Sequence, residues 1–237
     1  MVIDERGPKH IGIILDGNRR WAKAHGMAAI EGHKVGAQRV KDIVKYSYDI
    51  GLKYLTVYAF STENWKRTSE EVSAIMIILE KYLDRFLKKA DLENIKLRII
   101  GDIESKTIPE NLRKKMNEMQ DRTKNNTGLQ LNVAFNYGGR AEIIRATKNI
   151  AKLVKDGKID IDEINEELFT NNLYTAGQED PDLVIRTSGE MRTSNFLPWQ
   201  ITYSEFLFLE KYWPEFTAKD IDDAIENFTN RERRTGK

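Results

Sequence analysis

The stretch HIGIILDGNRRWA, residues 10–22, decides the fold of this chain. Its first residues are apolar or small, and they run directly into an aspartate, a glycine, an asparagine and two arginines. A strand that is apolar on both faces is typical of the buried interior of a parallel sheet. Open parallel sheets bind ligands at the carboxyl ends of their strands, so the charged residues after this run predict a binding site.

Further apolar runs extend this pattern along the chain, and helical periodicity separates them. Strands that alternate with helices indicate an α/β fold with a central, mostly parallel sheet of about six strands, flanked by helices on both faces. No Pro-, Gly- or Ser-rich linker interrupts the pattern, so we expect a single domain over residues 1–237. The candidate strands are residues 10–15, 54–60, 95–100, 129–135, 181–186 and 205–210, and the candidate helices are about 34–50, 70–91, 108–124, 139–155 and 217–231.

Composition excludes several classes of function. Lys and Arg total 38 and Asp and Glu total 37, and this balance gives no support for binding to nucleic acid. The absence of cysteine excludes disulfides, thiolate catalysis and cysteine-based zinc sites. No stretch reaches the roughly 18 consecutive apolar residues of a spanning helix, and the charged N-terminal residues do not resemble a secretory signal. We therefore expect a cytoplasmic protein whose contact with a membrane is peripheral.

Polar clusters follow four of the predicted strands. They are DGNRRW (16–21), STENWKR (61–67), NYGGR (136–140) and TSGEMRTSN (187–195). Because the carboxyl ends of neighbouring parallel strands meet at one edge of a sheet, we expect the four clusters to lie together.

The side chains in these clusters suit a phosphorylated ligand. Guanidinium groups match phosphate oxygens in a bidentate way, and neutral amides and hydroxyls add donors. A carboxylate among these cations is explained if it holds a divalent cation that bridges to phosphate, so we predict Mg²⁺ at Asp16, with Glu205 as a second acid. The arginine candidates are Arg19, Arg20, Arg67, Arg140, Arg186 and Arg192, and the neutral candidates are Asn18, Asn64, Ser188, Ser194 and Asn195.

Simpler interpretations of the same residues stay open at this point. An aspartate after a strand is most often a helix N-cap, and a single arginine is most often a solvated surface charge. His33 fits a structural histidine as well as a ligand. The apolar stripe of the helix 70–91 fits either core packing or the wall of a cavity, because both need one apolar face. Its members are Val72, Ile75, Met76, Leu79, Tyr82, Leu83, Phe86 and Leu87.

Several long motifs, in order from His10 to Arg234, resemble the cis-prenyltransferase family, and most closely its bacterial undecaprenyl diphosphate synthases. The resemblance covers nearly the whole chain, which makes it far more specific than a lone glycine motif. The motifs are HIGIILDGNRRWA (10–22), GHKVGA (32–37), YLTVYAFSTENWKR (54–67), LNVAFNYGGR (131–140), PDLVIRTSGEMRTSNFLPWQITYSEFLF (181–208) and NRERR (230–234).

This resemblance implies a Mg²⁺-dependent homodimer that adds isopentenyl diphosphate repeatedly to an allylic diphosphate such as farnesyl diphosphate. Each new double bond is cis, and the product grows into a hydrophobic tunnel between helices and sheet. It also implies undecaprenyl diphosphate as the product, the precursor of a lipid carrier for cell-wall synthesis. A lipid product implies peripheral contact with the inner face of the membrane.

The resemblance also implies roles for individual residues. Asp16 and Asn64 are implied to be catalytic, with Asp16 and Glu205 near the metal, and Glu190 supports the isopentenyl diphosphate site. The residues implied to bind the allylic diphosphate are Gly17, Asn18, Arg19, Arg20, Trp21 and His33. The loop that closes over the substrates is implied to comprise Ser61, Thr62, Glu63, Trp65, Arg67 and Glu71. Isopentenyl diphosphate is implied to be held by Arg186, Arg192 and Ser194.

Three positions depart from the common family pattern. Arg19 stands where many bacterial members have glycine, and Ala28-Ala29 stands where members commonly carry Pro-Arg. We therefore hypothesise that Arg19 replaces the missing arginine at the allylic diphosphate. Met191 stands where some members have a histidine near the metal, so it is not a ligand candidate.

Two other functions remain as alternatives. Phosphatases that use a strand-end aspartate as nucleophile usually carry a second acid two residues later, where this chain has Asn18. A non-catalytic lipid-phosphate binder or partner subunit of the same fold tends to lose the catalytic aspartate and arginines. This chain retains Asp16, Arg186 and Arg192, which favours an active enzyme.

Overall fold

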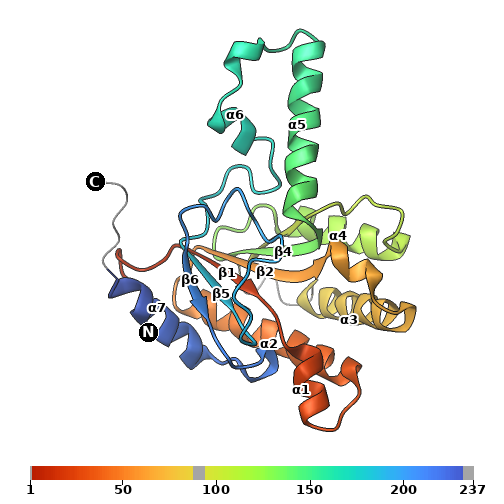
Figure 1. Ribbon diagram of the computed structural model, residues 1–237, viewed down its shortest axis with the longest axis vertical. Helices are drawn as coiled ribbons and strands as arrows, with labels where there is room; N and C mark the ends of the chain where they lie inside the picture. The colour runs from red at the N-terminus through yellow and green to blue at the C-terminus, as the bar shows by residue number, and fades with distance from the viewer. Residues whose placement is uncertain (1, 88–93, 232–237) are drawn as a thin grey trace.

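The centre of the molecule is a six-stranded sheet in which every neighbouring pair of strands is parallel (Figure 1). The computed structural model describes residues 2–87 and 94–231. The strand order is β3-β4-β2-β1-β5-β6, and all six predicted strands are confirmed within one or two residues at most ends. The strands are β1 (His10–Ile14), β2 (Tyr54–Ser61), β3 (Lys96–Ile100), β4 (Gln130–Tyr137), β5 (Leu183–Arg186) and β6 (Glu205–Phe208).

The five predicted helices are confirmed, with differences at their ends. The first begins at Ala29 rather than at 34, and the part of the second beyond residue 87 lies outside the described residues. The ranges of the candidate helices do not include a short helix that directly follows β1, at the strand-to-helix turn of residues 16–18. The helices are α1 (Asn18–Ala24), α2 (Ala29–Asp49), α3 (Ser69–Leu87), α4 (Glu110–Thr123), α5 (Gly139–Lys155), α6 (Glu166–Thr170) and α7 (Ala218–Thr229), with 3₁₀ turns η1 (Thr62–Lys66), η2 (Ile161–Glu163) and η3 (Trp213–Glu215).

One face of the sheet is covered by helices. The apolar sides of α2, α3, α4 and α7 share one core with the strands, and each contributes buried side chains such as Ile43, Met76, Met116 and Ile225. Burial of such side chains stabilises the fold by roughly 1.5–3 kcal/mol each. In the described part of the chain, no helix is long and apolar enough to cross a membrane.

The other face of the sheet is covered differently. A second core there joins Ile14 and Val184 of the sheet to Phe196, Leu197 and Ile201, which lie in a segment of turns rather than in a helix. The expectation of helices on both faces is therefore wrong for this face. Phe196 stacks on Tyr58 of β2 with ring centroids 4.9 Å apart, so aromatic contact replaces helix packing.

The order in which the chain adds strands reverses between β1 and β5, and this switch point locates the candidate binding site. From β1 the chain builds outward through β2 on one side, whereas β5 and β6 lie on the other side. Ile14, the last residue of β1, is in register with Arg186, the last residue of β5. Ligands of open α/β sheets bind at such a switch point, outside the carboxyl ends of the strands.

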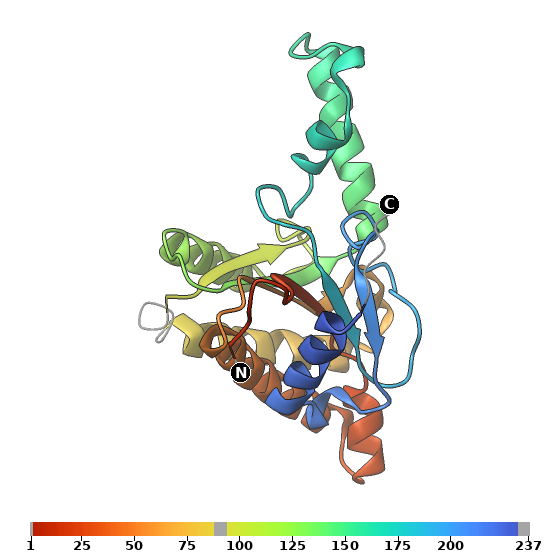
Figure 2. The same cartoon turned by 90° about the vertical axis from the view of Figure 1, so that its left-hand side faces the viewer.

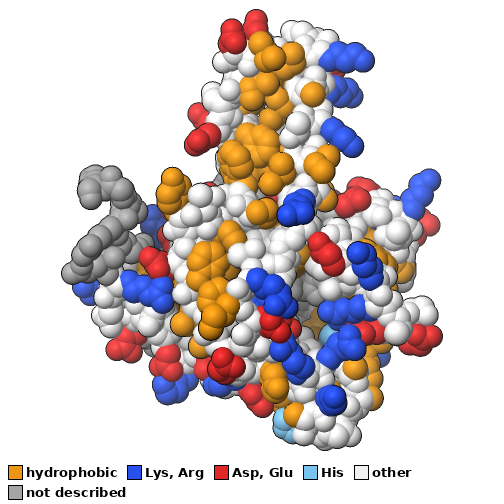
Figure 3. Space-filling model, in the orientation of Figure 1, with side chains coloured by type: hydrophobic (Ala, Val, Ile, Leu, Met, Phe, Trp, Pro, Cys, Tyr) orange, Lys and Arg blue, Asp and Glu red, His pale blue; other side chains and the backbone are white. Residues whose placement is uncertain are grey.

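A long arm projects from the sheet in both ribbon views (Figures 1 and 2). It consists of α5, η2 and α6, and its base is fixed by the buried Glu142. The Glu142 carboxylate accepts hydrogen bonds from the Tyr137 hydroxyl and the Tyr174 backbone N–H, each at 2.6 Å. Hydrophobic side chains gather along one side of the arm in the space-filling view (Figure 3), where Ile144 and Ile161 are 55% and 66% exposed.

The amino ends of the strands carry a buried chain of neutral hydrogen bonds. The Nδ1 of His10 lies 2.7 Å from the Glu179 carbonyl, which only accepts, so Nδ1 carries the proton. Nε2 therefore accepts from the Thr56 hydroxyl at 2.7 Å, and that oxygen accepts from the Asn132 amide at 2.8 Å. Three strands are thus joined on one side of the sheet by side chains that are all fully buried.

Candidate active site

Asp16 lies at the carboxyl edge of the sheet and is held there by two arginines. Its Oδ2 accepts from Arg186 at 2.8 Å and lies 3.2 Å from Arg20, while its Oδ1 accepts from the Gly17 backbone N–H at 2.7 Å. Partial burial alone would raise the pKa of Asp16. The hydrogen bond and charge of Arg186, with the charge of Arg20, outweigh that effect and hold the pKa below its ordinary value. Asp16 is therefore a carboxylate at neutral pH.

Arg186 is the most buried cation of the site, with its side chain 4% exposed. Besides Asp16, it donates to the Ser194 hydroxyl at 2.7 Å and to the Arg192 backbone carbonyl. A charge this buried is costly unless its donors are engaged. Its Nε has no hydrogen-bond partner within residues 2–87 and 94–231, so one donor of the guanidinium is still unsatisfied.

Thr187 holds the backbone of Asp16 and was missed by the sequence analysis. Its hydroxyl donates to the Asp16 carbonyl at 2.7 Å and accepts from the Asp16 N–H at 3.1 Å. The Trp213 N–H also donates to the Asp16 carbonyl, at 3.0 Å. The sequence does show that Thr187 directly follows Arg186 at the end of a strand. A threonine at such a position is common, however, so its residue type does not indicate that it holds the backbone of Asp16.

The helix α1 sits unusually close to α2, and two glycines allow it. A β-carbon at Gly32 would lie 2.0 Å from the Asn18 carbonyl, and one at Gly36 would lie 2.0 Å from the Asn18 side-chain oxygen. Real β-carbon contacts at that distance are impossible, so only glycine permits this approach. The turn before α1 also needs glycine, because Gly17 has φ 103°. These three glycines place Arg19 and Arg20 at the edge of the site.

Glu71, near the start of α3, contacts two arginines and a neutral histidine from three other segments. It lies 2.9 Å from Arg67, 3.2 Å from His33 and 3.6 Å from Arg19. Burial acts to raise the pKa of Glu71, but its hydrogen bond to His33 and the nearby arginines outweigh this and lower the pKa. Burial lowers the pKa of His33 in turn, so its ring is neutral at pH 7 and donates to the carboxylate through Nε2.

The residues after β2 form a short, internally hydrogen-bonded loop. The Asn64 side chain accepts from the Ser61 N–H at 3.1 Å, and the Ser61 side chain reciprocally accepts from the Asn64 backbone. Asn195 donates to Glu63 at 2.9 Å, and the Trp65 indole donates to Asn136 at 2.8 Å. The loop is therefore tied to the clusters that follow β4 and β5.

Other predicted residues take positions that the sequence did not indicate. Arg19 has its ion pair with Glu71 rather than with the residues around Asp16, so its proposed replacement of an allylic arginine gains no support from this contact. Trp21 stacks on His25 with centroids 4.3 Å apart. Thr62 donates to Glu63 at 3.2 Å. The Arg140 backbone N–H donates to the Asn195 side chain at 2.8 Å, which joins the cluster 136–140 to the cluster 187–195.

Glu205 does not share a site with Asp16 in this chain, which corrects the expectation of a paired acid. Glu205 opens β6, in register with Leu183 and Ile11, so it lies at the amino edge of the sheet. Asp16 is five residues farther along the strand direction than Ile11, roughly 16 Å away. Glu205 instead pairs with Arg231 at 2.6 Å.

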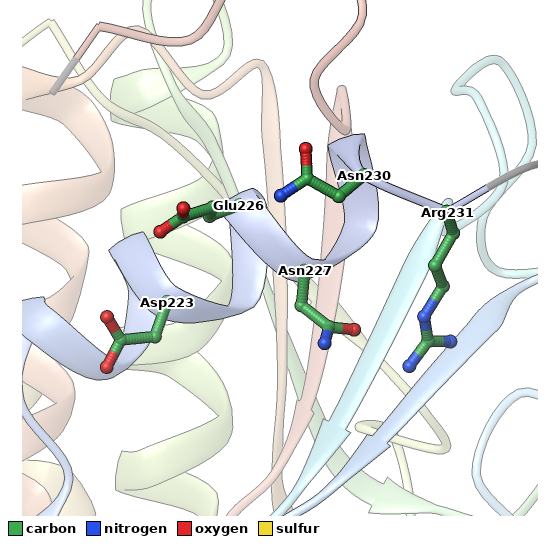
Figure 4. A pocket seen from close by; sticks show the side chains of 5 residues that line it. All are labelled: Asp223, Glu226, Asn227, Asn230 and Arg231. Atoms are coloured by element: carbon green, nitrogen blue, oxygen red, sulfur yellow. The ribbon is translucent and has the colours of Figure 1, made fainter.

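The same Arg231 borders a shallow hollow along the end of α7 (Figure 4). The hollow is also lined by Asp223, Glu226, Asn227 and Asn230, and Figure 4 shows Arg231 beyond the last turn of the helix, next to two strands. These side chains are acidic or neutral apart from Arg231, so the hollow does not suit a diphosphate.

The carboxyl edge of the sheet is, by contrast, positively charged. Two groups contribute, and together five arginines face three carboxylates. Diphosphates carry several negative charges, and Arg forks are well matched to them. The first group is Arg20, Arg186 and Arg192 with Asp16 and Glu190, and the second is Arg19 and Arg67 with Glu71.

The sequence and the structure of this chain both match known proteins over nearly its full length. A family model described as putative undecaprenyl diphosphate synthase matches residues 14–236. An isoprenyl transferase of Clostridium perfringens is 46% identical over 236 residues, covering 100% of this chain and 92% of that protein. A ditrans,polycis-undecaprenyl-diphosphate synthase of Micrococcus luteus, named as (2E,6E)-farnesyl-diphosphate specific, is 49% identical over 97% of this chain and 91% of its own length.

Solved structures agree with these matches. Lavandulyl diphosphate synthase from Lavandula x intermedia, determined in complex with dimethylallyl diphosphate, superposes with a TM-score of 0.95 at 36% identity. A probable undecaprenyl diphosphate synthase from Campylobacter jejuni superposes with a TM-score of 0.80 at 34% identity. Each alignment covers 99% of this chain and 100% of the matched chain.

Proposed function

The chain belongs to the undecaprenyl diphosphate synthase family and is a cis-prenyltransferase, and on this premise we propose that it adds isopentenyl diphosphate repeatedly to farnesyl diphosphate. The proposed product is undecaprenyl diphosphate. The observation that carries the proposal is the Asp16 carboxylate between Arg20 and Arg186 at the switch point of the sheet. A carboxylate that stays ionised among arginines suits a site for two diphosphates and a divalent cation.

We assign the two diphosphates to the two sides of Asp16. The allylic diphosphate lies on the α1 side, near Gly17, Asn18, Arg20 and His33. Isopentenyl diphosphate lies on the β5 side, where Arg186, Arg192 and Ser194 converge. Arg20 and Arg192 both pair with Glu190, so either arginine can exchange that carboxylate for a phosphate.

The residues present fit Mg²⁺ only together with a substrate. Within the described residues, no group of three or more His, Cys, Asp or Glu side chains could hold a metal ion. Mg²⁺ is commonly bound through one or two carboxylates and substrate phosphates, and Asp16 supplies one such carboxylate. When bound there, Mg²⁺ would neutralise charge on the departing diphosphate.

The chain's own residues then promote an electrophilic condensation. Arg20 and the turn at Gly17 hold the allylic diphosphate and stabilise its negative charge as the carbon–oxygen bond breaks. Arg186 and Ser194 orient isopentenyl diphosphate so that its double bond attacks the allylic carbon. The adduct loses a proton to give the new double bond. The loop 61–67, with Asn64, closes over both substrates and excludes water.

The apolar face of α3 offers a surface along which the growing prenyl product can bind. Ile75 and Leu79 pack against the core between sheet and helices, partly buried. We propose that this face, with α2, forms the wall of a hydrophobic tunnel whose depth sets the product length. The predicted stripe continues to Phe86 and Leu87, whose side chains lie outside the described part of the structure.

We also propose that two copies of the chain associate through the arm. On the arm, Ile144, Ile161 and Ile164 expose 55%, 66% and 43% of their surface. Exposed apolar side chains that lie together are typical of a surface that contacts another protein. Light scattering after size exclusion gives the oligomeric state, and Ile144→Asp is expected to shift it toward monomer.

Peripheral contact with a membrane follows from the lipid nature of the product.

The direct test uses the purified chain with labelled isopentenyl diphosphate, farnesyl diphosphate and Mg²⁺. The products are dephosphorylated and sized by chromatography, with Asp16→Asn as the control. A ladder that ends in one dominant long polyprenol, absent in the control, is the expected result. If no primer is elongated by a folded wild-type protein, the non-catalytic partner-subunit alternative replaces this proposal.

A further inference from the structure

A cleft lies between α3 and the start of α4, on the side of α3 that faces away from α2. Figure 1 labels the three helices. Its volume is about 560 Å³, within the range of small-molecule sites. Three contacts, on opposite sides of α3, fix its orientation. The Tyr82 hydroxyl lies 3.5 Å from Gln38 of α2, whereas Glu80 accepts from Asn111 and Lys115 of α4, each at 2.9 Å. The cleft is therefore separate from the tunnel proposed between α2 and α3.

The floor of the cleft is apolar. Met76 and Leu112 are 7% and 1% exposed, and Val72 and Pro109 line the walls beside them. Ile77 stands at the rim with 52% of its surface exposed. A cleft of this size with an apolar floor favours a ligand with a hydrocarbon or aromatic body.

The charges at the two ends of the cleft differ in sign. At the end near the active site, Arg67 and Arg19 share the single carboxylate of Glu71. At the far end, Glu80 and Asp84 share the single ammonium of Lys115. In these pairs two cations share one carboxylate at the Arg67 end and two carboxylates share one cation at the Glu80 end, so a ligand with one anionic group is oriented with that group at Arg67.

We propose that this cleft binds a small amphipathic anion, with its apolar body on Met76 and Leu112 and its anionic group on Arg67. The bound anion draws Arg67 away from Glu71 and packs against Trp65, which also lines the cleft. These contacts displace the loop 61–67. Turnover falls as a result, although the ligand does not occupy the diphosphate sites. The effect on turnover rests on the function proposed above for that loop. The binding itself does not.

The test measures binding of decanoate to the intact protein by calorimetry, without turnover. A saturating non-reactive farnesyl thiodiphosphate with Mg²⁺ occupies the proposed allylic diphosphate site and the entrance of the tunnel. Ser73→Phe fills the cleft from α3, whereas Lys81→Phe adds the same ring outside the residues that line it. Decyltrimethylammonium, a cation with the same chain, tests the sign of the head group. Thermal unfolding of each variant verifies that it is folded.

We expect decanoate to bind one site in the presence of the analogue, at least tenfold more weakly to folded Ser73→Phe and unchanged to Lys81→Phe. The cation is expected to bind at least tenfold more weakly than decanoate. Loss of decanoate binding when the analogue is present, or equal binding to Ser73→Phe and wild type, overturns the cleft as its site. If Ser73→Phe does not fold, Ile77→Glu at the rim replaces it, with the same expected loss. Saturable binding that leaves the turnover rate unchanged overturns the regulatory part alone.

Discussion

The His10–Thr56–Asn132 network and the region of Arg186 and Ser188 lie at opposite ends of the strands and differ in how their buried polar groups are satisfied. At the amino edge, His10, Thr56 and Asn132 pass hydrogen bonds from one to the next, and each is neutral and fully buried. At the carboxyl edge, Arg186 and Ser188 each bury a polar atom that has no partner in the described part of the chain. Ser188 also holds a left-handed backbone with φ 81°.

This difference separates what stabilises the fold from what binds a ligand. Unsatisfied buried donors and left-handed non-glycine residues each cost free energy, and they persist where function needs them. A satisfied neutral network has no donor left for a ligand. Variants at the amino edge are therefore expected to change stability, and variants at the carboxyl edge to change activity.

The largest effect is expected from a matched pair of Asp→Asn changes. Asp16→Asn should lower the rate of isopentenyl diphosphate incorporation about a thousandfold, because the charge for the metal is lost. The buried Arg186 loses its carboxylate partner in this variant, so the melting temperature should fall too, and turnover is the measurement that separates the two variants. Asp182→Asn, at the amino edge, weakens the acceptor of the Lys9 and His10 backbone N–H groups, so it should lower the melting temperature but retain turnover. Reversal of this pattern would break the comparison.

A second expected effect concerns pH. Burial lowers the pKa of His10 to about 4, whereas the unfolded chain has the ordinary value of 6.5. The unfolded state therefore binds the proton first, so stability is complete above pH 6.5 and falls as the pH is lowered toward 4. The contribution of His10 alone to this loss is about 3 kcal/mol. Burial raises the pKa of Asp180 to about 6, so that carboxyl acts in the opposite direction over part of the window. Urea unfolding at several pH values measures it.

The His10→Gln variant isolates this contribution, because His33 also has a lowered pKa and acts in the same direction. The variant's unfolding free energy should depend less on pH between 6.5 and 4 than that of the wild type. Parallel profiles for the two proteins would show that His10 does not carry the effect.

A smaller loss of stability is expected from Thr56→Val, which keeps the shape of the side chain and removes the central hydroxyl of the network. His10 and Asn132 each lose a buried partner, at a cost of about 2–3 kcal/mol. This corresponds to a drop in melting temperature of roughly 5–10 °C. Thr147→Val, which removes an exposed hydroxyl, is the control and should leave the melting temperature nearly unchanged. Equal effects would contradict the importance of burial.

The smallest effect is expected at Glu71, a satisfied carboxylate that lies at the functional edge. Glu71→Gln keeps the size of the side chain but weakens the contacts to Arg67 and Arg19, so the loop 61–67 closes less readily. Turnover should fall about fivefold, the equivalent of roughly 1 kcal/mol. Steady-state kinetics measure it, with the exposed neighbour Glu70→Gln as control. Unchanged kinetics would place Glu71 with the purely structural residues.

The sequence was sufficient to predict the strands and the edge that they share. Continuous apolar runs such as residues 10–14 are distinctive, and parallel strands necessarily place their following residues together. The turn at residues 16–18 indicates the start of a helix, but no range could be given for α1, because NRRWAKA is short and has little amphipathic pattern of its own. Its stability depends on close packing against Gly32 and Gly36, which belong to another helix.

The misplaced acid has a different cause. Glu205 was proposed as a second acid beside Asp16, first from its residue type and then from the resemblance, but it opens a strand, whereas Asp16 follows one. In a parallel sheet these positions lie at opposite edges. The contacts of Glu71 with Arg19 and His33 could not be predicted from the sequence either. These residues are far apart in the chain, and no local pattern indicates that they meet.

The position of β1 has a consequence for the synthesis of the chain. One side of β1 pairs with β2, but its other side pairs with β5, whose register joins Ile11 to Leu183. A ribosome that adds about 5–20 residues per second needs roughly 10–35 s to reach that partner. Throughout that interval the strand that precedes Asp16 has an open edge. Nascent chains are thus expected to depend on chaperones, and truncation before residue 183 should yield aggregates rather than a smaller folded protein.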